Sequence, residues 1–325
     1  MTESAFKKKR EASWMEFEMM TGGGRRDIRR GASRFPAAFR ELTQDLNTAR
    51  AHGFDAAIIE RLNILVNEGS QILYGQHEWS FRLFARFVLC TFPRKVRSQW
   101  RGIGAAFLVF YGLAFFSAFL CVRFPEFVHE FISESQAEDI AGMYDPESGH
   151  FLVPPDVSSR ADMFGYYIYN NVSIAFRTFA GGIIAGIGSL FILSLNGIFL
   201  GAAAAHIINL GFGKTFFPFI IGHSSFELTA IILSAHAGLL LGYRFFIPGG
   251  RSRSAALRRA GRDALPLITG SVLFLVAAAV IEAFWSPRHT LPAALRLGVG
   301  AAGWVLVGLY LLLAGRKGDD RGRPH

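Results

Sequence analysis

The sequence predicts an all-α fold: a polytopic transmembrane helical bundle of about six spans, one of them broken or re-entrant, preceded by a small cytosolic helical region. Composition is the first observation, because 51% of the 325 residues are hydrophobic and only 18% are charged, against about 25% charged in soluble domains. The second is a series of apolar runs near the ~20 residues that cross a bilayer. The third is the uneven distribution of Lys and Arg around these runs.

Composition and motifs also exclude several classes of protein. With 32 Phe, the chain is too apolar and too aromatic for a disordered protein. Its two cysteines, Cys90 and Cys121, form neither a disulfide scaffold nor a cysteine-based zinc motif. The common signatures of P-loop NTPases, zincins and serine hydrolases are absent. Basic clusters beside spans fix topology and attract anionic lipid, so we expect contact with membrane lipid and none with nucleic acid.

The first third of the chain differs from the rest. Residues 1–34 are basic and end in a glycine-rich stretch, which predicts a flexible tail with some helix at residues 14–20. Residues 35–101 are predicted to form a cytosolic amphipathic helical region. Within it, apolar side chains recur at helical spacing on both sides of Gly53, which predicts two helices joined by a turn.

Residues 102–314 form the predicted transmembrane bundle. One run is long and interrupted by Pro218 and Gly222, which predicts the broken or re-entrant span. The acidic loop 123–171 contains enough Phe and Tyr to predict partial order, folding back over the outer face, and one helix that continues out of the first span. The predicted spans are 103–122, 172–195, the short 196–210, 216–246, 264–285 and 291–314.

Charge predicts the orientation of these spans. Residues 1–101 hold 18 Lys and Arg against 11 Asp and Glu, whereas the loop 123–171 holds 2 against 9. Six Arg lie within residues 244–263, and the tail 315–325 is basic again. Because cytoplasmic loops carry the excess of Lys and Arg, we expect both termini in the cytoplasm and the acidic loop outside.

Ionisable side chains within the spans mark a candidate site, because each costs at least about 2.5–3.5 kcal/mol on insertion. With the topology fixed, six of them fall at one level in the outer leaflet. An unpaired carboxylate there is costly, so we expect Glu227 and Glu282 each to have a cationic or hydrogen-bonding partner within this set. The predicted intramembrane polar cluster consists of Arg177, His206, His223, Glu227, Glu282 and Arg296.

The Gly-His-Ser-Ser-Phe-Glu-Leu segment is the most informative part of this cluster. A helix is expected to begin there after the break at Pro218, and one face of it then carries His223 and Glu227. His236 lies about 180° away, which argues against a three-ligand metal site on this helix alone. Three interpretations stay open: a structural hydrogen-bond network, a proton or ion site, and a metal site completed by His206. We predict no cofactor, no metal ligand and no catalytic residue.

Small residues recur at four-residue spacing in the apolar runs. In lipid, such spacing allows the backbones of two helices to approach closely. We expect these residues to pack helices within the chain, while a homo-oligomer seam stays open as the alternative. The pairs are Gly182 with Gly186, Gly197 with Gly201, and Gly238 with Gly242.

Taken together, these motifs make residues 38 to 315 similar to the stage II sporulation protein M family of integral membrane proteins. Members carry a comparable Asn-Gly turn and an H-G-x-F-E-L-x-A signature. Ser224 stands here where Gly is usual, whereas the His, Phe and Glu of the signature are kept. The positions that carry the resemblance are Asn196, Gly197, His223, Phe226, Glu227 and Gly238.

The resemblance implies a protein of the bacterial inner membrane that has no chemistry of its own. In spore formers the family member is similar to a scaffold for peptidoglycan-remodelling partners, and most relatives occur beside RDD-domain membrane proteins and MoxR-type ATPases. A non-enzymatic scaffold that recruits partners to an envelope-associated complex is therefore the first interpretation. The alternative is a transporter or channel for an ion or small solute, which paired intramembrane charges and broken helices favour.

Overall fold

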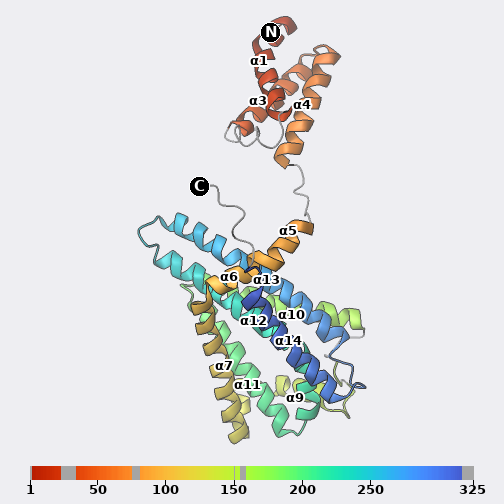
Figure 1. The fold of residues 1–325 in the computed structure, drawn as a ribbon, viewed down its shortest axis with the longest axis vertical. Coiled ribbons are helices and arrows are strands. Elements are labelled where there is room, and N and C mark those ends of the chain that lie inside the picture. The colour runs from red at the N-terminus through yellow and green to blue at the C-terminus, as the bar shows by residue number, and fades with distance from the viewer. Residues whose placement is uncertain (1, 23–33, 75–80, 150, 154–158, 317–325) are drawn as a thin grey trace. The chain divides into compact units, whose positions relative to one another are not determined.

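The computed structural model describes residues 2–22, 34–74, 81–149, 151–153 and 159–316. All regular secondary structure in these ranges is helical (Figure 1). The chain divides into two compact units, Met1–Leu83 and Phe84–His325. The α-helices are α1 (Glu3–Gly22), α3 (Phe35–Ala51), α4 (Ala56–Tyr74), α5 (Phe81–Arg86), α6 (Phe92–Ser98), α7 (Trp100–Arg123), α8 (Val128–Phe131), α9 (Glu134–Tyr144), α10 (Arg160–Ala180), α11 (Ile187–Asn209), α12 (Gly213–Phe246), α13 (Arg253–Phe284) and α14 (Ala293–Leu313).

The N-terminal unit packs α1, α3 and α4 around one core. Helix α3 has a proline in its first turn, where the missing N–H has no intrahelical role. Gly53 has a φ of 61°, and this left-handed conformation lets the chain turn between α3 and α4. The two helices predicted on either side of Gly53 are thus confirmed.

The prediction of a flexible tail is wrong for α1. Trp14 and Phe17 are each only 1% exposed and share the core of this unit with Leu62 of α4. The charged run from Lys7 to Arg10 masks the helical spacing of the apolar residues, which explains the error. Residues 23–33, the glycine-rich part of the predicted tail, fall outside the described residues.

A buried carboxylate fastens α1 to α3. Asp45 accepts hydrogen bonds from Arg10 Nε at 2.7 Å and from Trp14 Nε1 at 2.8 Å. The hydrogen bond to Asp45 raises the pKa of Arg10 above its usual value. The exposed carboxylate of Glu41 contacts the same guanidinium at 3.1 Å.

Asp45→Ala is expected to lower the free energy of unfolding of the N-terminal unit by about 1–3 kcal/mol, because it leaves the buried Trp14 N–H without an acceptor. Hydrogen exchange of α1 and α3 in the full chain measures this change. Glu41→Ala is the matched control, since an exposed ion pair contributes about 0–1 kcal/mol. Equal exchange in the two variants would contradict the role of Asp45.

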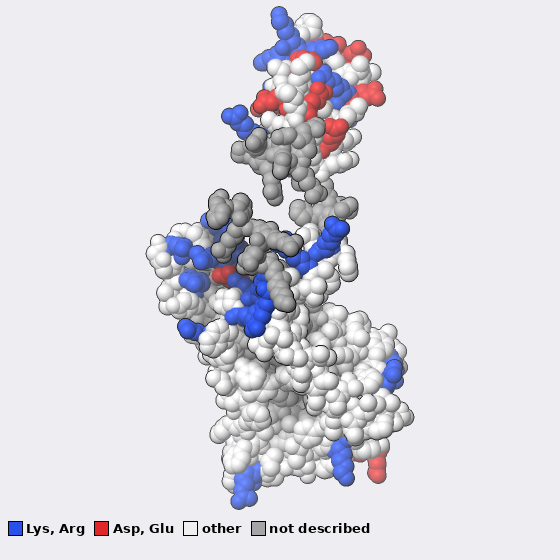
Figure 2. All heavy atoms as spheres, viewed as in Figure 1, with Lys and Arg blue, Asp and Glu red and all other residues white. Residues whose placement is uncertain are grey.

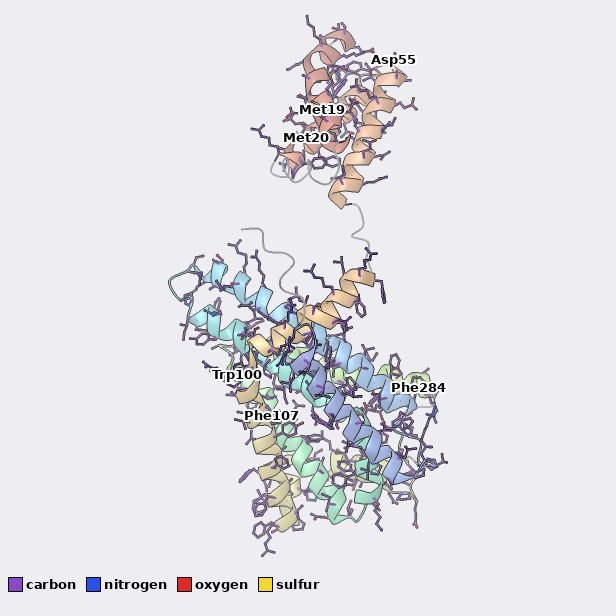
Figure 3. All side chains as sticks on the ribbon, viewed as in Figure 1. Met19, Met20, Asp55, Trp100, Phe107 and Phe284 are labelled. Carbon is purple, nitrogen blue, oxygen red and sulfur yellow. The ribbon has the colours of Figure 1, made fainter. Side chains whose placement is uncertain are left out.

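The second unit is a multi-pass membrane bundle. Five of its helices are long and apolar enough to cross a membrane: α7, α11, α12, α13 and α14. Figure 2 shows a broad uncharged surface over this unit, with most of the visible Lys and Arg at one end and a few at the other. On α7, Trp100 and Phe107 are 66% and 46% exposed and project from the helix into the surroundings (Figure 3), as aromatic side chains do at membrane surfaces.

Helix α10 supplies a sixth traverse of the bundle. Hydrogen bonds between helix ends define the two ends of the bundle. At the basic end, Arg97 before α7 donates to the carbonyl of Leu311 near the end of α14. At the far end, Asn209 at the end of α11 donates to the carbonyl of Cys121 near the end of α7.

The two ends of α10 lie at opposite ends of the bundle. Arg160, the first residue of α10, donates to the carbonyl of Ala283 at the end of α13. Because α13 starts at the basic end, where Asp263 pairs with Lys95, its end and the start of α10 lie at the far end. After α10, Gly182 packs against Gly238, near the end of α12. Six traverses therefore place the start of α7 and the end of α14 at the same end. Polar residues of α10 explain why its hydropathy is too low to count as a span.

The predicted spans 172–195 and 196–210 are wrong in their boundaries. The chain turns between α10 and α11, where Ala185 and Gly186 have φ values of 55° and 81°. Residues 187–209 then form one continuous helix, so Asn196 and Gly197 lie in mid-helix instead of at a turn. Apolar composition continues through the turn, and only the glycine spacing there could have revealed it.

The predicted break in the fourth run is also wrong. Helix α12 is continuous over 34 residues and contains Pro218 near its start. Pro218 lies in the second turn of the helix, and membrane helices tolerate an internal proline because neighbouring groups satisfy the freed backbone carbonyl. Gly222 lies against Trp285 and Ser286 instead of interrupting the helix.

The loop over the far end is ordered in its described part. Val128, Ile132 and Ala137 form a buried cluster with Cys121 and with alanines of α11, so the loop folds back onto the bundle as predicted. The predicted single helix continuing from the first span is wrong, because α7 ends before Pro125 and α9 begins afresh. A capping box of Ser133 and Gln136 starts α9.

The bundle also begins earlier than the predicted boundary at residue 102. Phe92 on α6 is 2% exposed and meets Phe274 of α13 edge-on at 5.4 Å. Tyr310 Oη of α14 donates to the carbonyl of Val88 at 2.6 Å. Residues 84–98 therefore pack with the membrane helices and are not part of the N-terminal unit.

Candidate functional site

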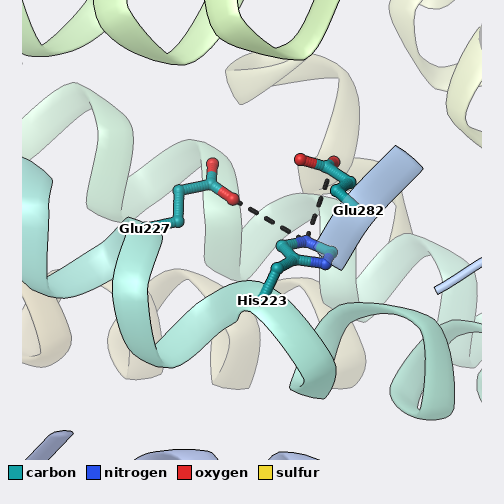
Figure 4. A group of neighbouring side chains, drawn as sticks. All are labelled: His223, Glu227 and Glu282. Carbon is teal, nitrogen blue, oxygen red and sulfur yellow. Dashed lines mark ion pairs between the residues drawn. The ribbon is translucent and has the colours of Figure 1, made fainter. Parts of the chain in front are cut away.

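Three ionisable side chains meet inside the bundle. His223 and Glu227 lie one turn apart on α12, and Glu282 faces them from the last turn of α13 (Figure 4). His223 Nε2 lies 3.7 Å from a carboxylate oxygen of each glutamate. The side chains of His223 and Glu282 are 5% and 9% exposed, and that of Glu227 is 19% exposed. The predicted shared face of His223 and Glu227 is thus present in the structure.

A second layer of polar groups holds these side chains in place. Ser286 Oγ is hydrogen-bonded to His223 Nδ1 at 3.1 Å, and the carbonyl of Ser286 accepts from Arg296 Nη2 at 2.6 Å. Asn171 of α10 donates a long hydrogen bond of 3.5 Å to Glu282 Oε2. The imidazole is therefore oriented so that Nε2 faces both carboxylates.

Two tyrosines lie near the carboxylates. Burial raises the pKa of Tyr144 on α9 above its usual value, and the charges of Glu282 and Glu227 act in the same direction. Tyr167 on α10 packs on α13 against Ala283, and its buried hydroxyl has no hydrogen-bond partner among the described residues. Tyr144 also packs edge-on against Phe216 and Phe219 of α12, so the far-end loop covers this part of the bundle.

The other members of the predicted cluster are placed differently. Arg296 is 4% exposed and joins the site through Ser286 instead of pairing with a carboxylate. His206 lies near the end of α11 and interacts with the backbone of Ala137. Arg177 is exposed in the last turn of α10 at the basic end, away from His223, Glu227 and Glu282, so it does not lie at their level as predicted.

That error follows from the misplaced boundary between α10 and α11. His236, predicted to lie on the opposite face from Glu227, does so: it approaches Gln99 at 3.4 Å near the basic end. The sequence pattern does not predict that Asn171, Ser286 and Tyr167 belong to the site. Asn171 and Tyr167 lie on a helix too polar to be recognised as a span, and Ser286 is distant in sequence from His223.

The small residues predicted at four-residue spacing make close helix crossings. Gly197 and Gly201 lie against the backbone of α7 at Phe110 and Ala114, and Ser117 Oγ donates to the carbonyl of Ile198 across the same crossing. These contacts confirm that the small residues at four-residue spacing pack helices within the chain.

Three further signature residues have structural roles as well. Gly238 lies against Ser189 and against the backbone of Phe179. Phe226 packs edge-on against Phe274 at 5.4 Å. Asn196 donates to the carbonyl of Ile192 within α11. The signature thus combines helix packing with the polar site.

The side chains of this site are suited to binding a cation. Its groups are two carboxylates and one imidazole, which bind protons or metal ions. The three donor atoms lie within 4.8 Å of one another. Two cavities in the described part of the chain lie away from this site, one on the N-terminal unit beside Trp14 and one beside Cys90 and Gly315.

Comparison with known families identifies two matching regions. A family model described as "Stage II sporulation protein M" matches residues 105–287, more than half of the chain. A model described as "Domain of unknown function (DUF8413)" matches residues 4–75, which lie within the N-terminal unit. Neither a curated protein nor a solved structure matches the chain.

Proposed function

Because the chain belongs to the stage II sporulation protein M family, we propose that it is a non-enzymatic scaffold of the bacterial inner membrane. In this proposal both termini are cytoplasmic, and the N-terminal unit recruits protein partners to an envelope-associated complex. The basic end of the bundle, with Arg94, Lys95 and Arg97, supports the orientation, since Lys and Arg accumulate on the cytoplasmic side.

The observation that carries the proposal is the independence of the N-terminal unit. It has its own core, its own buried Asp45 network and its own matching family model. Insertion into a membrane requires only the apolar helices, so the separately folded N-terminal unit supports an additional role. Such a unit provides a surface for soluble partners while the bundle holds it at the membrane.

An exposed apolar stripe on α1 is the surface that we assign to partner binding. Met15 and Met19 lie one turn apart and are 51% and 70% exposed, whereas the neighbouring Met20 packs toward the core (Figure 3). Methionine adapts to irregular partner surfaces. Exposed Lys8 and Glu16 flank the stripe with charge.

Partner capture by the full chain in mild detergent tests this role. The partner to probe is a MoxR-type ATPase from the same cell, with an RDD-domain membrane protein and a peptidoglycan-remodelling protein as further candidates. Met15→Glu/Met19→Glu should reduce capture at least about 10-fold, a loss of about 1.4 kcal/mol of binding free energy. Ala56→Glu/Ala57→Glu adds the same charge at the exposed start of α4 and should leave capture unchanged.

The buried polar site supports a second function, transport of an ion or small solute. Ionisable groups at membrane depth are typical of transport pathways. A liposome flux assay with protons and with monovalent and divalent cations separates the two functions. Flux that disappears in Glu227→Gln, together with equal capture by wild type and Met15→Glu/Met19→Glu, would replace the scaffold by the transporter.

A further inference from the structure

The spacing within the polar site does not fit a simple hydrogen-bond network. An N–H···O hydrogen bond spans 2.7–3.2 Å, whereas His223 Nε2 stands 3.7 Å from an oxygen of Glu227 and 3.7 Å from an oxygen of Glu282. One ring nitrogen faces two carboxylates, and it carries at most one proton. The three donor atoms surround a common point instead of pairing.

The second layer resembles that of a metal site. In such sites the ligating imidazole donates its other N–H to a protein group, and ligating carboxylates are hydrogen-bonded in turn. Here His223 Nδ1 contacts Ser286 Oγ at 3.1 Å, and Asn171 contacts Glu282. When the Nδ1 proton is donated to Ser286, the lone pair of Nε2 points between the carboxylates.

Burial and charge specify the kind of ion. Two carboxylates and a neutral imidazole carry a charge of −2, and one divalent cation neutralises it inside the bundle. Zinc takes imidazole nitrogen and carboxylate oxygen in sets of three or four ligands. Calcium requires six to eight oxygen ligands, and magnesium keeps most of its waters, so a nitrogen-containing set of three favours a transition metal.

We propose that His223, Glu227 and Glu282 bind one divalent transition-metal ion of the zinc type, through Nε2 and one oxygen of each carboxylate. Three protein ligands leave a fourth position for water. A polar group lies beside the last turn of α13: Tyr167 is 4% exposed and packs against Ala283, next to Glu282, and its hydroxyl is unpartnered among the described residues. The ion joins α12 to α13 at the far end of the bundle, and the proposal is independent of the scaffold function.

Metal content and calorimetry on the untagged full chain in detergent test the proposal. Protein stripped with a chelator and reloaded should bind one zinc per chain and melt at a higher temperature, while calcium and magnesium leave the melting temperature unchanged. Cobalt in place of zinc should give the intense visible bands of a four-coordinate site. Wild-type protein that neither binds zinc stoichiometrically nor gains thermal stability from it would overturn the proposal, whatever the variants do.

Variants then locate the ion. His223→Ala and Glu282→Gln should each weaken zinc binding more than about 100-fold, and Ser286→Ala by about 10–100-fold, as for groups that orient a ligand. His206→Ala is the matched control, because it removes a histidine of the membrane helices that lies outside the three ligands, and it should bind zinc like wild type. Zinc retained in His223→Ala, or lost in His206→Ala, would contradict the assigned ligands.

Discussion

His223→Leu is expected to destabilise the membrane bundle by about 3–5 kcal/mol, because it removes the imidazole that lies between two buried carboxylates and leaves them facing each other. Glu227 and Glu282 both face His223 Nε2 at 3.7 Å, and Asn171 offers Glu282 a long hydrogen bond only. Thermal unfolding in detergent, followed by size-exclusion chromatography of the remaining folded protein, measures the effect.

The triple variant His223→Leu/Glu227→Leu/Glu282→Leu is the control for this prediction. Replacing a whole buried charged set by apolar residues is often neutral or stabilising, so the triple variant should recover most of the wild-type melting temperature. His206→Leu tests the removal of a histidine elsewhere in the bundle. A His223→Leu protein that melts like wild type would show that the histidine does not stabilise the carboxylates.

Gly201→Leu is expected to abolish most of the folded protein. A Cβ at this position would overlap the carbonyl oxygen of Ala114 and the hydroxyl of Ser117 on α7. Overpacking of a core costs about 1–3 kcal/mol when side chains can adjust, and a backbone carbonyl cannot move aside without separating the two helices. The yield of monodisperse protein and its melting temperature report the loss.

Gly112→Leu is the matched control for the helix crossing. Gly112 lies on α7 itself, is exposed, and has no described atom within 4 Å of an added Cβ. A leucine there should be tolerated, since it adds apolar surface toward lipid. Similar yields of Gly201→Leu and Gly112→Leu would contradict the close packing of α7 against α11.

The sequence predicts the class of fold well because apolar length and charge asymmetry are direct consequences of the bilayer. It fails where local sequence and tertiary packing disagree. Apolar residues run through the turn at Gly186, so composition places a helix where the chain reverses. Pro218 suggests a break that the continuous α12 does not have, since membrane helices tolerate an internal proline when neighbouring groups satisfy the freed backbone carbonyl.

The site is predictable in part. The four-residue spacing of His223 and Glu227 follows from helix geometry, and depth in the membrane connects them with Glu282. The second layer is not predictable in this way, because Ser286 and Asn171 reach the site through packing between distant segments. Arg177 is misplaced because the predicted span starts at residue 172, whereas α10 starts at Arg160, 12 residues or about three helical turns earlier.

The topology of the bundle requires six membrane crossings, with α10 as the second of them. Cysteine labelling in a background without Cys90 and Cys121 tests this directly, with one probe at Gly149→Cys before α10 and one at Ser254→Cys after α12; both positions are exposed. Six traverses predict labelling from opposite sides: Gly149→Cys reacts with an impermeant reagent in intact cells, and Ser254→Cys reacts only after permeabilisation. If α10 does not cross the membrane, the two positions lie on the same side. Equal labelling of both positions in intact cells would therefore contradict the six-crossing topology.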